Sequence, residues 1–259
     1  MNKIPKVIHY CWFGKNKLSK SAKKCIKSWK KHLPNYEIIE WNENNFDINC
    51  NEYVREAYKS KKYAFVSDYA RIYAHYNYGG IYMDTDVEVI KSLDKFLCND
   101  AFAGLENEYS IQTAVMGCCK GNLLFKEFLE YYTDKKFIKD DKSLDLTTNV
   151  EIITNICKKY GVIINNEIKS IRGFIIYPKD YFCQLNHNNK QSDFSKNTHT
   201  IHHFEGSWIS REEKKSKKKY IRSLERKEWL CKYISERNSY IILDFKFIIR
   251  NKIKSMLKQ

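Results

Sequence analysis

The sequence "FVSDYARIYAHYNYGGIYMDTDVEV" occupies residues 65–89 and carries the pattern that indicates the fold. Its first part, Phe65–Tyr78, has aromatic and apolar residues at helical spacing, and Gly79 is well placed as a left-handed helix cap. An apolar stretch follows at once, so we expect residues 81–90 to form one strand with a bend near Thr85. A helix that leads directly into a buried strand is typical of an α/β protein.

Two aspartates stand one residue apart in the expected strand. Side chains alternate along a strand, so Tyr82, Asp84 and Asp86 would share one side. Carboxylates that close repel each other unless a cation or water lies between them. Hard oxygen ligands of this kind suit Mg²⁺ or Mn²⁺. On these residues alone, a solvated acidic turn explains the pattern equally well.

Other segments support one α/β domain. Residues 6–13, 19–33 and 36–41 follow the order strand, helix, strand, which is typical of a parallel α/β unit. Further along the chain the patterns predict strands at 101–106, 111–118 and 174–178, helices at 123–132 and 148–160, and a strand-like, aromatic-rich segment at 198–208. Beyond residue 210 the sequence becomes densely charged. We therefore expect a catalytic domain over residues 1–210 and a basic helical extension over residues 211–259.

Composition narrows the class of protein. The chain has 259 residues and a formal net charge of +15, so it is long enough for one sizeable core and its surface attracts anions. Its nine cysteines are scattered without CxxC spacing, which predicts neither a zinc site nor a disulfide framework. We find no signal peptide or membrane-span pattern and expect a cytoplasmic protein.

The end of the chain has the pattern of a basic amphipathic helix. Apolar residues in 239–259 fall near one helical stripe, with lysines and an arginine elsewhere. Such a helix can dock on a membrane surface, and a helix packed on the catalytic domain is an equally good interpretation.

Two further groups of polar residues stand out. Asp68 and Arg71 lie at i and i+3 on the helix that precedes the aspartates, where a surface ion pair is the simplest interpretation. His202 and His203 stand together in a strand-like segment, and alternation predicts that only one of them points toward a given site.

With these residues in view, the sequence resembles glycosyltransferase family 32, whose members contain a DXD sugar-binding region and include bacterial capsular and surface-polysaccharide enzymes. The resemblance rests on "IPKVIHYCWFG" at residues 4–14, on residues 65–89 and on "THTIHHFEGSW" at residues 198–208. The large clostridial glucosylating toxins look like distant relatives through the same blocks. This resemblance implies a GT-A fold, an α/β fold with a Rossmann-like mixed sheet flanked by helices that binds a nucleotide-sugar.

The resemblance also implies roles for residues in the first two blocks. Trp12 would stack on the nucleobase, and Tyr10 or Cys11 would line the same pocket. Asp68 and Arg71 would hold the hydroxyl groups of the donor sugar and its diphosphate.

For the aspartate motif and the last block, the resemblance implies a metal site. Asp84 and Asp86 would form the metal site: Asp86 would coordinate the metal directly, and Asp84 would contact ribose, the sugar or metal-bound water. Tyr82 would pack beside the sugar, and Thr85 would also contact the donor. His203 would complete the metal shell, although the doublet with His202 leaves this choice ambiguous. A final pair, Ser207 and Trp208, would close over the diphosphate.

The implied activity is a metal-dependent, retaining transfer of a sugar from a nucleotide-sugar. UDP is the first expectation for the nucleotide and GDP the second, with Mn²⁺ or Mg²⁺ as cofactor. The acceptor would be a glycan or lipid-linked glycan in surface polysaccharide or glycolipid synthesis, at the inner face of the membrane. Asp84, Asp86 and Arg71 are the expected catalytic residues. No nucleophilic carboxylate is evident in the sequence, which favours front-face attack by the acceptor hydroxyl.

Two other functions compete with this interpretation. A strand followed by DxD also resembles the haloacid-dehalogenase-like phosphohydrolases, but Glu88 stands where that family usually has Thr or Val. Their later lysine and paired-acid motifs are not evident, although "KDD" at 139–141 is a partial match. The basic charge and many tyrosines would suit a nucleic-acid-binding protein, yet no nucleic-acid-binding signature accompanies them.

Overall fold

The computed structural model describes residues 2–183 and 194–206. All of these except Gly206 belong to one compact unit, Met1–Glu205. Ser207, Trp208 and the expected extension at 211–259 lie outside the described residues, so the boundary near residue 210 stays a prediction. Along the described ranges, no helix combines the length and the apolar character needed to cross a bilayer.

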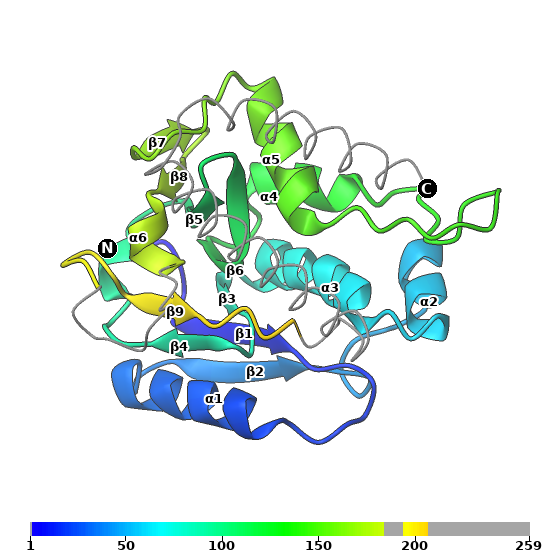
Figure 1. The fold of residues 1–259 in the computed structure, drawn as a ribbon, viewed down its shortest axis with the longest axis horizontal. Coiled ribbons are helices and arrows are strands. Elements are labelled where there is room, and N and C mark those ends of the chain that lie inside the picture. Colours follow the sequence, from blue (N-terminus) through cyan, green and yellow to red (C-terminus); the bar gives the residue numbers. More distant parts are fainter. Residues whose placement is uncertain (1, 184–193, 207–259) are drawn as a thin grey trace, which may run out of the picture. The chain divides into compact units, whose positions relative to one another are not determined.

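The main sheet has seven strands in the order β2-β1-β3-β6-β5-β8-β7 (Figure 1). Neighbours β2, β1 and β3 are parallel, β6 is antiparallel to both β3 and β5, β5 and β8 are parallel, and β7 is antiparallel to β8. The predicted α/β class with a mixed sheet is confirmed, and the arrangement is consistent with a GT-A fold. The strands are β1 Val7–Cys11, β2 Glu37–Trp41, β3 Gly80–Met83, β5 Ala101–Asn107, β6 Ser110–Cys118, β7 Lys169–Ile171 and β8 Phe174–Tyr177.

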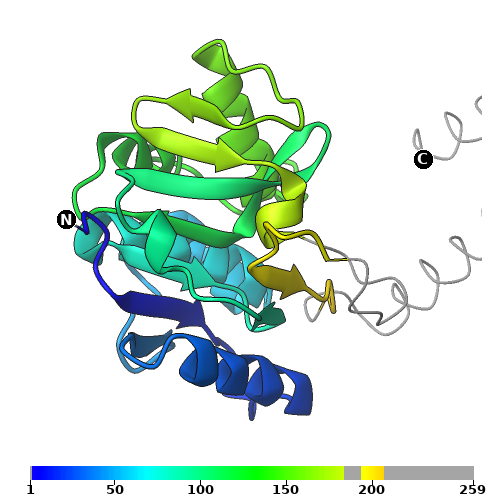
Figure 2. The same cartoon turned by 90° about the vertical axis from the view of Figure 1, so that its left-hand side faces the viewer.

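Helices cover both faces of the sheet (Figures 1 and 2). One hydrophobic core lies between the sheet and α2, α3, α4 and α5, and a second lies between the sheet and α1, η1 and α6. Three of these elements were not expected from the sequence: α2 and the two short helices η1 and α6. Asn51 caps α2 by accepting a hydrogen bond from the Val54 N–H. The helices are α1 Lys20–His32, α2 Glu52–Lys59, α3 Tyr63–Tyr78, η1 Asp94–Phe96, α4 Leu123–Glu130, α5 Asn149–Lys159 and α6 Lys179–Phe182.

The first strand, helix and strand form the expected parallel unit. The Ser19 side chain accepts a hydrogen bond from the Ala22 N–H and starts α1, and Trp29 buries the apolar side of the helix. Strands β1 and β2 then pair in parallel, with Val7 opposite Glu37.

Residues 81–90 do not form one strand, so that prediction is wrong. Strand β3 of the main sheet ends at Met83. A turn then leads into β4, and in this turn the Val87 N–H donates a 3.0 Å hydrogen bond to the Asp84 carbonyl oxygen. Strand β4 (Val87–Val89) pairs with β9 (Thr200–His202) in a separate two-stranded sheet. The turn is stabilised from α1, because the indole N–H of Trp29 donates to the Val87 carbonyl oxygen over 2.7 Å.

Gly79 ends α3, but not as a left-handed cap. Its N–H donates to the His75 carbonyl oxygen, while its φ of 69° and ψ of −173° lie outside the left-handed helical region. Only glycine adopts such a conformation readily. A Cβ at Gly79 would also lie 2.7 Å from the backbone nitrogen of Lys120, so this sharp connection from α3 to β3 requires glycine.

This topology places the end of β3 at a switch in strand order. The chain leaves β1 for β2 on one side, and β3 adds to β1 on the other side. In open α/β sheets, ligands bind outside the carboxyl ends of strands at such a point. Trp12 directly follows β1 and Asp84 directly follows β3, so both lie at this edge.

Candidate active site

Three potential metal ligands meet where β3 ends. Asp84, Asp86 and His202 each offer one ligand atom, and these atoms all lie within 4.8 Å of one another. Asp84 follows β3, Asp86 lies in the turn before β4, and Val87 pairs with His202 across the β4–β9 sheet. Two carboxylates and an imidazole fit Mn²⁺, which accepts both oxygen and nitrogen ligands.

Asp86 is held from several sides. Its carboxylate lies 3.3 Å from His202 Nε2 and accepts a 2.9 Å hydrogen bond from the Glu205 N–H, while the His203 N–H donates to its carbonyl oxygen. Burial acts to lower the pKa of His202, but the hydrogen bond and charge of Asp86 outweigh burial and raise this pKa to about 10. Burial acts to raise the pKa of Asp86, yet the contact with His202 lowers it. The metal-free pair is therefore a carboxylate and an imidazolium.

The histidine doublet is divided between two carboxylates. His202 faces Asp86, whereas His203 Nε2 lies 3.0 Å from Glu88 Oε2. The family pattern assigned His203 as the metal ligand, but the structure brings His202 to the aspartates. The reason is the register of β9, whose last residue, His202, stands opposite Val87.

Arg71 lies behind Asp84 and connects it to α3. Its Nη2 lies 3.2 Å from Asp84 Oδ1 and 3.4 Å from Asp68 Oδ1, and its Nη1 donates to the Thr113 carbonyl oxygen over 2.8 Å. The guanidinium stacks over the Tyr82 ring, 4.5 Å from its centroid. Burial acts to lower the pKa of Arg71, but Asp84 and its other neighbours raise the pKa above its ordinary value. This is a buried network and not the surface ion pair that the spacing alone suggests.

Asp68 is buried in the same network. Burial raises its pKa to about 6, against the opposing charge of Arg71. At the start of α5, Asn149 donates from its backbone N–H to Asp68 Oδ2 over 3.2 Å and from its side-chain amide to the Asp68 carbonyl oxygen over 2.7 Å. The Tyr132 hydroxyl donates in turn to the Asn149 side chain. Sequence analysis missed Asn149 and Tyr132, because nothing local links a helix start to an aspartate so far away in the chain.

Tyr82 and Cys11 line the buried side of this network. The Tyr82 hydroxyl donates to Asp84 Oδ1 over 3.0 Å, and its side chain is buried under Arg71. Cys11 is also buried, and burial raises the pKa of its thiol to about 12 despite the opposing charge of Arg71. Both side chains therefore pack on the buried side of Asp84 and Arg71 and help to hold them in place.

The other predicted donor-binding residues do not all lie at the proposed site. Tyr10 alternates with Cys11 and points to the opposite face, where its hydroxyl donates to Glu40 and its ring packs edge-on against Trp29. Trp12 stands partly buried at the carboxyl edge, with its indole N–H donating to the Asn16 carbonyl oxygen over 2.6 Å. Thr85 lies partly buried in the turn between the aspartates.

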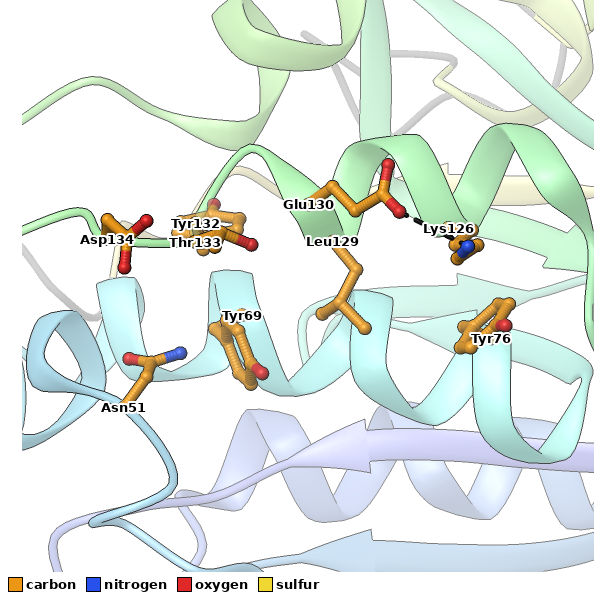
Figure 3. A pocket seen from close by; sticks show the side chains of 9 residues that line it. All are labelled: Asn51, Tyr69, Tyr76, Lys126, Leu129, Glu130, Tyr132, Thr133 and Asp134. Atoms are coloured by element: carbon orange, nitrogen blue, oxygen red, sulfur yellow. Dashed lines mark ion pairs between the residues drawn. The ribbon is translucent and has the colours of Figure 1, made fainter.

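A separate concavity lies between α3 and α4 (Figure 3). It has a volume of about 390 Å³, with Tyr69 and Tyr76 on one side and a Lys126–Glu130 ion pair on the rim. None of the predicted site residues lines it. The metal-ligand cluster and this groove are therefore built from different residues.

Comparison with protein families gives a match in the first half of the chain. Residues 19–103 match the model described as "Glycosyltransferase sugar-binding region containing DXD motif". The matched region includes Asp68, Arg71, Asp84 and Asp86, and it stops before His202.

Two similar proteins come from Schizosaccharomyces pombe. Inositol phosphoceramide mannosyltransferase 3 is 30% identical over 126 residues, which is 46% of this chain and 34% of that protein. Inositol phosphoceramide mannosyltransferase 1 is 29% identical over 109 residues, with 39% of this chain and 34% of that protein covered. The matched part thus spans about a third of the length of these curated relatives.

Several solved structures of glycosyltransferases are also similar to this chain. PaToxG glycosyltransferase has a TM-score of 0.44 at 18% identity, covering 60% of this chain and 69% of that one. A glycosyltransferase involved in glycosylation of the major capsid of PBCV-1 has a TM-score of 0.43 at 12% identity, covering 76% and 93%. The galactosyltransferase LgtC has a TM-score of 0.41 at 13% identity, covering 76% and 86%. The family match and the two yeast relatives support a DXD glycosyltransferase.

Proposed function

We propose that the chain is a metal-dependent, retaining glycosyltransferase that moves a sugar from a nucleotide-sugar to a glycan or lipid-linked glycan acceptor. The observation that carries this proposal is the cluster of Asp84, Asp86 and His202 beside the buried Arg71–Asp68 pair. A solvated acidic turn does not require an imidazole and a buried arginine at the same place. The match of residues 19–103 to the DXD sugar-binding region supports the proposal independently.

The chain's own residues suit the charge that develops on a nucleotide-sugar during transfer. Asp84, Asp86 and His202 would hold the divalent cation, which supplies charge neutralisation at the leaving diphosphate. Arg71 stays charged, and its Nη2 lies 3.2 Å from Asp84 Oδ1, so a fixed positive charge stands beside the proposed cation site. Asp68 would accept hydrogen bonds from hydroxyl groups of the donor sugar. Preorganised charges of this kind lower the barrier because they need no rearrangement during the reaction.

The proposal also covers the nucleotide of the donor and the pathway of the acceptor. We infer a UDP-sugar first and a GDP-sugar second, with Trp12 at the carboxyl edge of β1 stacking on the base. The acceptor would belong to surface polysaccharide or glycolipid synthesis on the cytoplasmic side of a membrane, and the two yeast relatives are named for transfer to a lipid. Assignment to the capsular branch of family 32, the distant similarity to clostridial toxins, and the roles of Ser207 and Trp208 are parts of this proposal.

A donor panel tests the proposal. Full-length protein is incubated with Mn²⁺ and each common UDP- and GDP-sugar, mannose donors included, and nucleotide release is measured. We expect release from at least one donor, lost with EDTA and in the Asp84→Ala/Asp86→Ala variant. Phosphate release from simple phosphate esters without nucleotide release from any sugar donor would favour the phosphohydrolase instead.

A further inference from the structure

Gln112 is a buried polar residue without a polar partner. Its side chain is 1% exposed, and neither its Nε2 nor its Oε1 has a hydrogen-bond partner among residues 2–183 and 194–206. An unpaired buried amide costs about 1–3 kcal/mol of stability. A Leu or Met side chain would fill the same volume without this cost, so the amide calls for an explanation beyond packing.

Gln112 lies in an irregular part of β6. Ala103 pairs with Met116 and Leu105 pairs with Ile111, so β6 advances five residues where its partner β5 advances two. The extra residues of β6 form a bulge, and bulges are over-represented next to active sites, where they redirect side chains.

The two residues that follow Gln112 in the bulge are hydrogen-bonded to the proposed active site. The Thr113 carbonyl oxygen accepts from Arg71 Nη1 over 2.8 Å, and the Ala114 carbonyl oxygen accepts from the Asp84 N–H over 2.9 Å. Gln112 thus directly precedes Thr113, whose carbonyl oxygen orients Arg71. It also lies two residues before Ala114, whose carbonyl oxygen orients Asp84.

The neighbours of the Gln112 amide connect it to the strand that carries His202. A Cβ on Gly104 would lie 3.1 Å from Gln112 Nε2 and 2.9 Å from the Phe182 ring, so this glycine leaves room for both side chains. The Phe182 carbonyl oxygen accepts a 2.7 Å hydrogen bond from the hydroxyl of Thr200, which lies on β9 two residues before His202. The amide therefore lies on the side of the sheet from which His202 approaches the two aspartates.

We propose that Gln112 recognises a hydroxyl group of the donor sugar and helps the site to discriminate between sugars. This inference rests on the proposed glycosyltransferase function. A carboxamide can donate to one hydroxyl group and accept from another, which suits a neutral, hydroxyl-rich ligand. A site with buried polar groups rejects a sugar that leaves them unpaired, so one amide can separate two sugars that differ at a single hydroxyl.

The test compares binding of nucleotides and nucleotide-sugars. Calorimetry in Mn²⁺ measures the affinity of full-length protein for UDP, GDP, UDP-glucose, UDP-galactose and GDP-mannose. For the preferred donor, we expect Gln112→Met to weaken nucleotide-sugar binding about three- to tenfold, as for loss of one hydrogen bond, and to leave binding of the free nucleotide unchanged. Gln112→Asn, which keeps a shorter amide, should lose part of the same affinity and provides a second, more conservative variant.

Unfolding by urea gives an independent readout. Because the amide has no partner within the described protein, Gln112→Met should be at least as stable as the wild type. The matched control is Thr154→Val, which removes a buried hydroxyl that accepts from the Ile111 N–H over 3.0 Å. The control should lose stability without changing the ratio of nucleotide-sugar to nucleotide affinity.

The possible outcomes distinguish failure of the proposed role of Gln112 from failure of the proposed transferase function. An unchanged affinity ratio in both Gln112 variants would overturn the role of Gln112 and leave the transferase function intact. A clear loss of stability in Gln112→Met would show an internal partner for the amide and would also overturn it. Wild-type protein that binds none of the five compounds would overturn the proposed function and, with it, this inference.

Discussion

The two aspartates of the DXD motif are one residue apart but belong to different structural environments. Asp84 directly follows strand β3 of the main sheet and contacts Arg71 and Tyr82, which come from the helix and strand that precede it in sequence. Asp86 lies in the turn that leaves the sheet and contacts His202 and Glu205, which lie more than a hundred residues away. Asp84 therefore has a local, cationic support, and Asp86 has a long-range support that includes a titratable imidazole.

The largest expected effect concerns Asp86 itself. Asp86→Asn keeps the size of the side chain and removes the charged ligand, so donor turnover should fall on the order of 10³-fold, as for loss of one preorganised electrostatic group. Circular dichroism should show the fold unchanged. Glu88→Gln, two residues further along the chain, is the control. It should retain turnover within about tenfold, since Glu88 contacts His203 and not the cluster. Equal turnover in Asp86→Asn and wild type would contradict the difference between the two sites.

Removal of the cation that supports Asp84 should affect stability. Arg71→Met leaves Asp68 and Asp84 without their buried partner, and breaking a buried ion pair in this way costs about 3–5 kcal/mol. Urea unfolding measures the loss. Lys24→Met removes an exposed lysine 3.6 Å from Glu88 and should change the free energy of unfolding by less than about 1 kcal/mol. Similar, small effects of both variants would mean that the Arg71 network does not hold the fold.

A smaller effect should distinguish the two histidines through pH. The pKa of His202 in the folded, metal-free protein is about 10, above its ordinary value of 6.5, so the imidazole carries a proton at neutral pH. A metal ligand must lose that proton, so the apparent Mn²⁺ affinity should rise with pH by up to about tenfold per unit below pH 10. Mn²⁺ titrations followed by electron paramagnetic resonance from pH 6.5 to 8.5 measure this slope.

His202→Gln and His203→Gln form the matched pair for that measurement. His202→Gln should bind Mn²⁺ more weakly and lose most of the pH slope, whereas His203→Gln should keep it. The reverse pattern would restore His203 as the ligand that the family pattern assigned.

The same contrast explains what the sequence predicts. Helix α3, strand β3 and the i, i+3 spacing of Asp68 and Arg71 follow from local periodicity, and the structure contains all three. The single strand over 81–90 was wrong, because its second half pairs with residues 200–202 in another sheet. Alternation predicted that the two histidines separate, but the choice of His202 depends on a register between distant segments. Asn149 shares that reason, since its hydrogen bonds to Asp68 form only in the folded chain.

The proposed function depends on Asp84, Asp86 and His202 forming one cation site that a nucleotide completes. The most direct measurement is the binding of Mn²⁺ by wild type and Asp86→Asn, each with and without UDP or GDP, followed by electron paramagnetic resonance. We predict one Mn²⁺ per wild-type chain, tighter binding when one of the nucleotides is present, and no such site in Asp86→Asn. Equal Mn²⁺ affinity in the two proteins, with no effect of either nucleotide, would contradict it.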